Sequence, residues 1–483
     1  MFDPGGNRAF DTVCRAIQRR TDSEGDVAMG VARYLTRAVL AAGAALLLPL
    51  TAAAQVCDVP NCLRDAETEQ VLHEFMDPIF VAAGLKPSEV YLVLVQDPTL
   101  NAFVANGQHI HVNTGTIIQT DTPEQLKGVL AHETGHITLG HAITRDNAMR
   151  AGSGISLISM GLGILAMAAG HPDAGVALIG SSSEFGILTI FKYTRIEESA
   201  ADQAALTYLD KTHQSPMGLI QFFEKFRYEE LMSESKQDPY FVSHPISSDR
   251  IQQIRRRAGE IEARAQPQSE HDIHELALIK AKLIGYLGPP NRVFNKYPLS
   301  DTSEPAQYAR AFSAYRSTDI QTAIKDTQKL IDDHPDNPYY DELMGQILFE
   351  SGKIDESITY HRKSVELAPD QPILKINLAR SLTESKNMDN VKEALNVLKD
   401  SIAQERSNPF AWFSLANAYG KLGKEPEADL ATAEEAYYVG AMSRAHTFAT
   451  RATMKLNPQT PEGRRAQDIA SVTDPRLQAQ RGR

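Results

Sequence analysis

The sequence predicts two structured parts: an α+β domain, mostly helical with a small sheet, followed by an all-α solenoid of helical hairpins. Two observations predict this order. Residues 90–115 hold apolar and alternating stretches typical of short strands, and helical periodicity flanks them on both sides. In the C-terminal half a pattern recurs with a period near 34, for example between Pro335 and Pro369. A chain of 483 residues is long enough for two or three domains.

The composition is that of an ordinary globular protein, with 42% hydrophobic and 23% charged residues, which excludes wholesale disorder. The formal net charge of −12 argues against nucleic acid as a partner, because such binding needs a basic surface. Cys57 and Cys62 are close enough in the sequence to form a small loop disulfide in an oxidising compartment. Two free thiols in a flexible N-terminus are the alternative.

Residues 1–54 have the features of a secretory signal peptide with an over-long start. Residues 38–54 form an uncharged apolar run that follows Arg33 and Arg37 and ends in small residues. A basic, then apolar, then small-residue order is typical of such signals. We expect cleavage near Ala54 and a periplasmic destination. A retained membrane anchor is the alternative, which the shortness of the run disfavours.

The first domain is expected over residues 55–270. Residues 63–85 have the apolar spacing of an amphipathic helix, and residues 90–95 have the composition of a buried strand. Residues 101–115 then alternate around Gly107, which predicts a β-hairpin. A short sheet followed by a helix is therefore expected in this order.

The helix that follows carries the central motif of the chain. Thr122 is its expected N-cap, with proline in the first turn and Gln125 three residues after the cap. Further along come His132 and His136, four residues apart in an H-E-x-x-H pattern, so that both imidazoles face the same way and can bind one zinc ion. Glu133 would lie beside the metal and take a proton from its water. A surface helix with two solvated histidines is the alternative.

A third ligand is expected downstream. Glu198 and Asp202 are spaced four apart on a predicted helix and face one way. Glu198 would complete a site of two histidines and one glutamate, and Asp202 would accept the second ring N–H of His132. Glu197 is the alternative ligand if the register differs by one. His141 lies off the ligand face and is expected to have a structural or supporting role.

Residues 151–169 contain no charge, and residues 174–191 return from a break after them. We expect an apolar hairpin over 151–191 that is buried or makes peripheral contact with a membrane surface near the active site. A hairpin that spans the membrane is the alternative.

These motifs resemble the gluzincin family that includes HtpX and the mitochondrial OMA proteases. The resemblance rests on residues 132–136 with His141, on the acidic motif over 198–202, and on the segment 101–103. The family's acidic motif usually has a second glutamate where this chain has Ala200, a departure that leaves the expected ligand untouched. A signal peptide in front and helical repeats behind narrow the match to the periplasmic β-barrel assembly-enhancing type. The resemblance implies an α+β zincin fold and a zinc-dependent protease.

The resemblance also implies a regulatory element. Residues 243–250 are similar to a family segment in which a histidine can occupy the open zinc position. His244 would then be a removable fourth ligand, and Arg250 would contact the substrate groove or the transition state. An imidazole that displaces the water would hold the enzyme off until the loop moves. An extended substrate would pair with an edge strand, and this strand contains Asn101, Ala102 and Phe103.

Beyond an expected linker at residues 271–303, about four tetratricopeptide repeats fit residues 304–458. The clearest unit contains the spacing of Trp412, Leu415 and Tyr419, and the third has a small insertion near Asn387. An all-α tetratricopeptide solenoid of this kind binds protein segments on its concave face. Residues 459–483 are expected to be a polar, frayed tail.

The expected function is that of a secreted periplasmic zinc endopeptidase. The resemblance implies that it degrades misfolded or stalled outer-membrane proteins and assists their assembly. Its substrates would be unfolded or misassembled outer-membrane proteins, and the repeats would contact the outer-membrane assembly machinery. One alternative is a non-enzymatic periplasmic assembly chaperone that keeps the metal domain as a relic. Another is a membrane-embedded quality-control protease of the HtpX kind.

Overall fold

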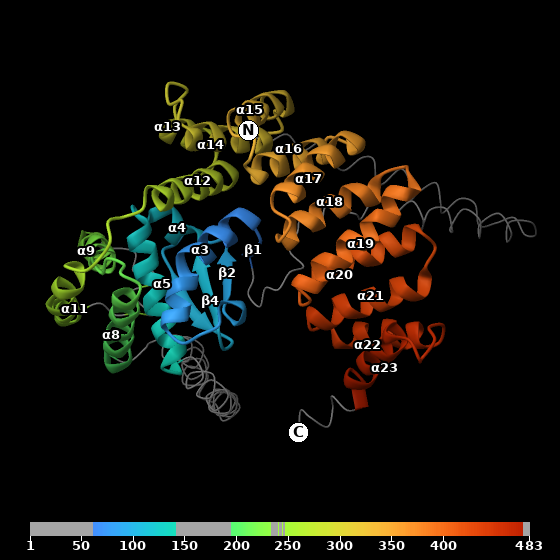
Figure 1. The fold of residues 1–483 in the computed structure, drawn as a ribbon, viewed down its shortest axis with the longest axis horizontal. Coiled ribbons are helices and arrows are strands. Elements are labelled where there is room, and N and C mark those ends of the chain that lie inside the picture. Colours follow the sequence, from blue (N-terminus) through green and yellow to red (C-terminus); the bar gives the residue numbers. More distant parts are fainter. Residues whose placement is uncertain (1–60, 142–194, 233–239, 241–243, 245–246, 477–483) are drawn as a thin grey trace, which may run out of the picture. The chain divides into compact units, whose positions relative to one another are not determined.

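The computed structural model describes residues 61–141, 195–232, 240, 244 and 247–476. These residues form a small sheet with helices around it, followed by a succession of helical hairpins (Figure 1). The predicted fold class, an α+β domain followed by an all-α solenoid, is confirmed. The predicted signal peptide and the apolar hairpin at 151–191 lie outside the described residues. Within the described ranges, no helix combines the length and the apolar character needed to cross a membrane.

The sheet has four strands in the order β1-β2-β4-β3. They are β1 (Cys62–Leu63), β2 (Tyr91–Val95), β3 (Ala102–Ala105) and β4 (His109–Asn113). β2 and β4 are parallel, whereas β1 with β2 and β3 with β4 are antiparallel. The expected hairpin is thus present as β3 and β4. Its turn uses positive φ at Asn106 (49°) and Gly107 (88°), the region that asparagine and glycine tolerate best. β3 lies at an edge of this sheet.

The helices of the first domain are α3 (Ala66–Ala82), the short 3₁₀ helix η1 (Pro87–Glu89), α4 (Thr114–Gln119), α5 (Pro123–Thr138), α8 (Arg195–Lys211), α9 (Met217–Met232) and α11 (Ser248–Glu262). α5 begins as predicted, with the Thr122 hydroxyl accepting a hydrogen bond from the Gln125 N–H and Pro123 in the first turn. α3 and α5 pack on the sheet, and α8 and α9 pack on α5. The core between them contains Leu72, Phe75 and Leu130, all buried.

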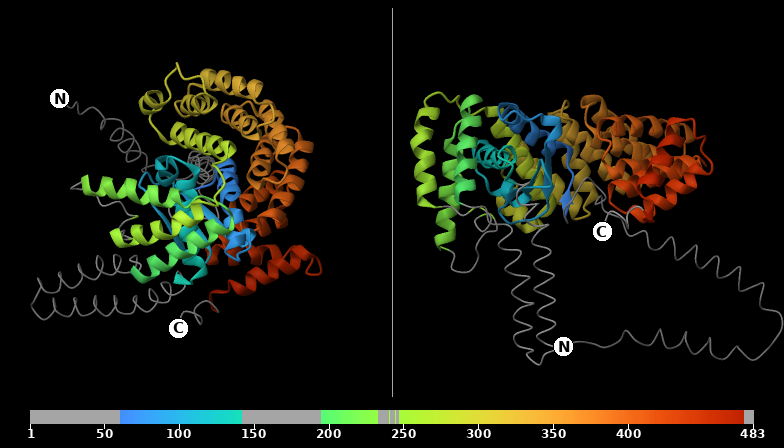
Figure 2. Two further views of the ribbon diagram at one scale, coloured as in Figure 1. Left: turned by 60° about the vertical axis from the view of Figure 1, so that its left-hand side comes forward. Right: turned by 90° about the horizontal axis from the view of Figure 1, so that it is seen from below.

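The second part consists of α12 (Glu270–Leu287), α13 (Pro290–Lys296), α14 (Glu304–Arg316), α15 (Ile320–Asp333), α16 (Pro338–Glu350), α17 (Ile354–Leu367), α18 (Pro372–Glu384), α19 (Met388–Gln404), α20 (Pro409–Lys421), α21 (Glu425–Tyr438), α22 (Met442–Thr453) and α23 (Pro461–Val472). From α14 onward each helix packs on the next (Figure 2). α19 has 17 residues and α17 has 14, so the insertion expected near Asn387 lengthens a second helix. Hairpins that stack in this way form a solenoid.

Two expectations differ from the structure. Residues 271–303, predicted as a linker within a helical stretch that ends in prolines, consist largely of α12 and α13 and are packed. α12 packs on both parts of the chain, because Leu276 and Ile279 belong to the core of the first domain and Leu278 belongs to a core in the repeats. The expectation of a frayed tail is wrong over 461–472, which form α23. Ile469 of this helix is fully buried against α22.

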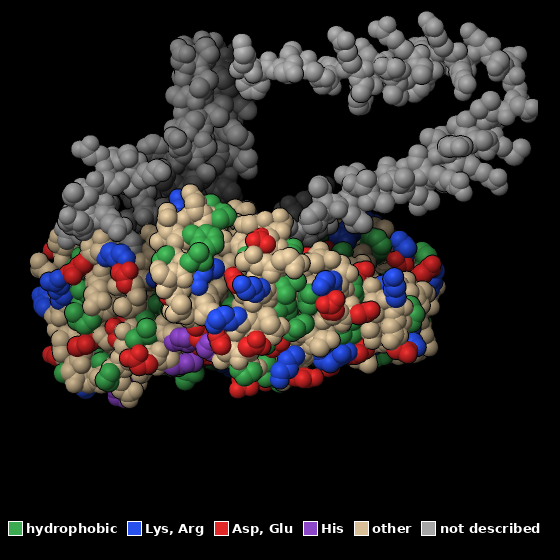
Figure 3. All heavy atoms as spheres, turned by 90° about the horizontal axis from the view of Figure 1, so that it is seen from above, with side chains coloured by type: hydrophobic (Ala, Val, Ile, Leu, Met, Phe, Trp, Pro, Cys, Tyr) green, Lys and Arg blue, Asp and Glu red, His purple; other side chains and the backbone are tan. Residues whose placement is uncertain are grey.

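Buried polar contacts join the start of α3 to the repeats. The Lys282 ammonium on α12 lies 2.5 Å from Asp65 and 3.0 Å from Glu67, and the Tyr308 hydroxyl donates to Glu67 at 2.8 Å. Arg64 pairs with Glu405, which follows α19. The described residues of both parts are therefore linked by charge as well as by apolar packing. On the face shown in Figure 3, acidic and basic side chains are interspersed, and histidines gather beside acidic side chains.

Candidate metal centre

Helices α5 and α8 bring the two sequence motifs together. His132 and His136 lie on one face of α5, Glu198 lies on α8, and all three side chains are fully buried. The two helices approach closely at Gly135, where an added Cβ would lie 2.9 Å from the carbonyl oxygen of Ala201. The glycine inside the motif therefore allows the contact that carries Glu198 to the histidines.

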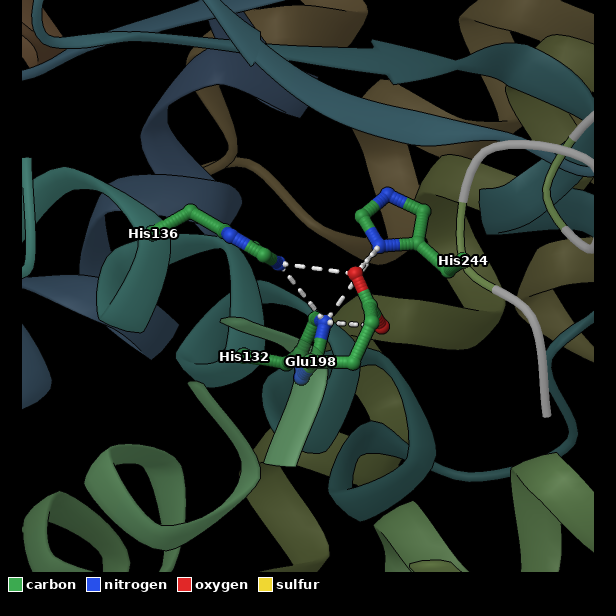
Figure 4. A group of neighbouring side chains, drawn as sticks. All are labelled: His132, His136, Glu198 and His244. Atoms are coloured by element: carbon green, nitrogen blue, oxygen red, sulfur yellow. Dashed lines mark hydrogen bonds and ion pairs between the residues drawn. The ribbon is translucent and has the colours of Figure 1, made fainter. Parts of the chain in front are cut away.

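Four donor atoms converge at this contact (Figure 4). His132 Nε2 lies 3.0 Å from His136 Nε2 and 3.4 Å from His244 Nδ1. Glu198 Oε1 lies 3.0 Å from His244 Nδ1 and 3.4 Å from His136 Nε2. A tetrahedron with metal–ligand bonds of ~2.0–2.1 Å has ligand atoms about 3.3–3.4 Å apart. These four separations are close to that spacing, and all four atoms lie within 4.8 Å of one another, so the group could hold a tetrahedral metal ion such as zinc.

His244 reaches the centre from a segment between α9 and α11. Its ring is buried and stacks on Tyr240, with ring centroids 4.7 Å apart. The His244 N–H donates to the Tyr240 carbonyl at 2.7 Å, and the Tyr240 N–H donates to the Leu100 carbonyl at 3.3 Å. The segment that carries His244 is thus attached just before the edge strand β3.

A second layer of side chains holds the donors in place. Asp202 Oδ1 lies 2.9 Å from His132 Nδ1. The Arg250 guanidinium donates to Asp202 through Nε and Nη2, both at 2.8 Å, and its Nη1 lies 2.7 Å from Glu198 Oε2. His141 Nδ1 lies 2.9 Å from His136 Nδ1. Such contacts fix ring orientation and tautomer in metal sites.

The pKa values of the two motif histidines are shifted in opposite directions. Burial by itself lowers the pKa of His132, but hydrogen bonds to Asp202 and Glu198 outweigh it and raise that pKa to about 10. Burial holds the pKa of His136 well below its ordinary value. Burial acts to raise the pKa of Glu198, yet His244 and the motif histidines hold it well below the ordinary value. Glu198 is therefore a carboxylate at neutral pH, as a metal ligand must be.

The structure also places the remaining residues that the sequence singled out. Glu133 is fully buried, with Oε1 3.5 Å from His244 Nε2. Glu197 is not among the four convergent residues. Arg250 is only 3% exposed and pairs with two carboxylates of the centre, Glu198 and Asp202.

Phe103 is half-buried on the edge strand and stacks on His111 at 4.7 Å. Ala102 is the first residue of that strand, and Asn101 directly precedes it. Cys62 is disulfide-bonded, and its predicted partner Cys57 lies outside the described residues.

Tyr240 was not singled out from the sequence, although it packs on His244 and anchors its segment. Its one sequence signal is its position four residues before His244, which places the two side chains on one face of a helical turn. That signal has meaning only where a helical turn joins the two residues, and the hydrogen bond from the His244 N–H to the Tyr240 carbonyl is what indicates one.

Comparison with known proteins identifies the first domain. Residues 63–258 match the profile of "Peptidase family M48". The chain is 22% identical over 373 residues to the beta-barrel assembly-enhancing protease of Escherichia coli (strain K12), covering 76% of this chain and 74% of that protein. It is 25% identical over 399 residues to the putative beta-barrel assembly-enhancing protease of Vibrio cholerae, covering 80% of each.

Among solved structures, YrrB, "a TPR protein with an unusual peptide-binding site", matches with a TM-score of 0.31 and 14% identity over 36% of this chain and 91% of that one. The family profile spans the H-E-x-x-H helix, the acidic helix and His244. Residues 63–258 are therefore similar to peptidase family M48, and the chain is a metalloendopeptidase.

Proposed function

We propose that the chain is a zinc-dependent endopeptidase in which His132, His136 and Glu198 hold the metal. The observation that carries this proposal is the convergence of buried nitrogen and carboxylate donors at tetrahedral spacing on α5 and α8. Two histidines and one carboxylate are typical of a catalytic zinc site, which keeps one position open for water or substrate.

The chain's own residues would divide the chemistry between them. Zinc, when bound, supplies Lewis-acid polarisation of the scissile carbonyl and makes the attacking water more acidic. Glu133, one residue after His132 on α5, would take the proton from that water and return it to the leaving amine. Asp202 would hold the His132 ring through its Nδ1 proton, and Arg250 would position both Asp202 and Glu198.

His244 would regulate this site by filling the fourth position. Its Nδ1 lies within 3.4 Å of His132 Nε2 and 3.0 Å of Glu198 Oε1, and the hydrogen bond from Tyr240 to Leu100 holds its segment beside β3. The same edge would pair with an extended substrate through Asn101, Ala102 and Phe103. Substrate entry would then require the His244 segment to move. We expect His244→Ala to cleave faster than wild type with zinc still bound; unchanged or slower cleavage would argue against the latch.

The proposed setting is the periplasm, where the enzyme would degrade misfolded or stalled outer-membrane proteins and assist their assembly. The names of the relatives that cover most of this chain support this proposal. The disulfide at Cys62 also supports it, because disulfides persist in oxidising compartments. The repeats would contact the assembly machinery, since solenoids of this kind bind protein segments. Fractionation of cells, with alkaline extraction of membranes, tests the location.

The central experiment compares wild-type protein with Glu133→Gln, measuring bound zinc and cleavage of an unfolded protein. Glu124→Gln is the matched control, because Glu124 lies on the same helix in its first turn, away from the donors. We expect equal zinc in all three proteins and loss of cleavage only in Glu133→Gln. Equal cleavage by wild type and Glu133→Gln would refute the assignment of the general base. Proteins that hold no zinc and do not cleave would instead favour an assembly scaffold.

A further inference from the structure

A cavity of about 290 Å³ lies between the start of α5 and the helices α12 and α13. Its walls include Pro123, Ile273, Leu276, Ala277 and Tyr297, and its polar groups are Asp121, Thr122, Gln268, Lys280 and Lys296. Pro123 precedes His132 by nine residues on α5, which is about 14 Å along the helix axis. The cavity is therefore separate from the metal centre, although the same helix borders both.

Positive charge exceeds negative charge around this cavity. Among the described residues that line it, Asp121 is the one carboxylate, and it already pairs with Lys225 at 2.7 Å. The Lys280 ammonium donates to the neutral carbonyl of Thr120, and Lys296 makes no ion pair with any described residue. Burial, and then the charge of Lys296, lower the pKa of Lys280 to about 8. An anion in the cavity would relieve this repulsion.

Two neutral features also favour an acceptor ligand. The amide nitrogen of Gln268 is buried and has no hydrogen-bond partner among the described residues, although a buried donor normally has one. The first turn of α5, at Pro123, presents the positive end of the helix dipole to the same space. Two ammonium groups, one amide N–H group and a helix N-terminus thus surround a cavity that holds a single, already paired carboxylate.

The remaining walls are apolar. Leu276 is buried, Ala277 and Tyr297 are half-buried, and Ile273 remains 40% exposed at the cavity edge. A bare phosphate or acetate ion would leave this surface uncovered. The volume is at the lower end for ligand pockets, which suits one residue-sized group. The walls therefore favour an anion that carries an apolar side chain.

We propose that this cavity binds the C-terminal residue of an extended polypeptide, with its carboxylate between Lys280 and Lys296 and its apolar side chain against Ile273 and Tyr297. The Gln268 amide would donate to the same carboxylate. This site would hold a chain end away from the metal centre, and its occupancy does not depend on the proposed zinc chemistry.

Calorimetric titration of the full chain tests the proposal. Glu133→Gln protein is used so that the peptide is not cleaved. The probes are the peptide Ala-Ala-Ala-Phe with a free C-terminus, the same peptide with a C-terminal amide, N-acetylphenylalanine and sodium acetate. Lys280→Gln and Lys296→Gln remove one donor each. Lys329→Gln is the control, because Lys329 is an exposed lysine on α15 that pairs with Asp333 one turn along the same helix.

We expect the free peptide to bind at least about tenfold tighter than its amide, and each cavity variant to lose about tenfold in affinity, as charge-assisted hydrogen bonds do. The Lys329→Gln control should bind like the parent. Lys296→Glu, at an exposed position, gives a second variant that should fold and should abolish binding. Equal binding of peptide and amide, absence of binding at millimolar peptide, or indifference to both lysine variants would overturn the proposal. N-acetylphenylalanine carries the same carboxylate and side chain and should compete with the free peptide. Equal affinity for acetate would overturn the role of the apolar walls.

Discussion

Asp202 gives the sharpest test of how the metal centre is held. Its carboxylate lies 2.9 Å from His132 Nδ1 and accepts from two nitrogens of Arg250 at 2.8 Å, so one buried group contacts a ligand and pairs a cation. Asp202→Asn keeps the size but removes the charge and turns one acceptor into a donor that faces the guanidinium. Loss of such a supporting contact weakens metal binding by about 10- to 100-fold, or about 1.4–2.7 kcal/mol.

The same change has a second consequence for the fold. Removing one partner of a buried ion pair costs about 3–5 kcal/mol. Arg250 keeps Glu198 at 2.7 Å, so we expect the lower end of that range for the protein without metal. Urea unfolding without metal measures this cost, and competition against a coloured chelator measures zinc affinity.

The control is Asp210→Asn on the same helix. Asp210 pairs with the exposed Arg264 at 2.8 Å, and an exposed pair contributes only about 0–1 kcal/mol. We expect this control to keep wild-type zinc affinity. A folded Asp202→Asn protein with zinc affinity within twofold of wild type would refute the supporting role of Asp202.

Three further predictions concern helix packing, the junction and pH. Gly135→Ala places a Cβ 2.9 Å from Ala201 in the α5–α8 contact, so we expect about 1–3 kcal/mol of lost stability and weaker zinc binding, measured by denaturation with and without zinc. Lys282→Met removes the ammonium group that lies 3.0 Å from the buried Glu67 carboxylate, so we expect the free energy of unfolding, measured in urea, to fall by about 3–5 kcal/mol. Adding Glu67→Gln should restore part of that stability. No restoration would contradict the pairing. Burial raises the pKa of Glu342 from 4.5 to about 7 in the folded protein. Between these two pH values the unfolded chain loses the proton and the folded protein keeps it, so wild type should lose stability as the pH rises. Glu342→Gln should not show this loss, which is at most about 3 kcal/mol. Equal dependence of unfolding free energy on pH in the two proteins would argue against the effect.

Local sequence was sufficient for most of the first domain. The Thr122 cap, the proline after it and the spacing of His132 and His136 are all local features, and α5 begins and presents its histidines as they predict. The hairpin around Gly107 was equally predictable, because positive φ at a tight turn favours glycine. The period near 34 in the second half likewise predicted stacked helical pairs, since each pair must bury one face against the next.

Such local patterns do not predict contacts between segments that are distant in the sequence. The prolines that follow α12 predict a linker, but Leu276 and Leu278 face the cores of two different parts. The polar composition of α23 predicts a tail, yet the burial of Ile469 against α22 orders it. In both cases a few apolar side chains outweigh the average polarity of the segment, and only their partners reveal this.

For the metal centre, the amino-acid pattern specifies the chemistry of the donors and their spacing within each helix. Helical periodicity places His132 with His136, and Glu198 with Asp202, on shared faces. Packing between helices then makes the two faces meet, brings His244 Nδ1 within 3.4 Å of His132, and pairs Arg250 with two carboxylates. These contacts cannot be predicted from the local pattern. The pattern determines on which face of its own helix a side chain lies, whereas the tertiary packing determines which residues that side chain contacts.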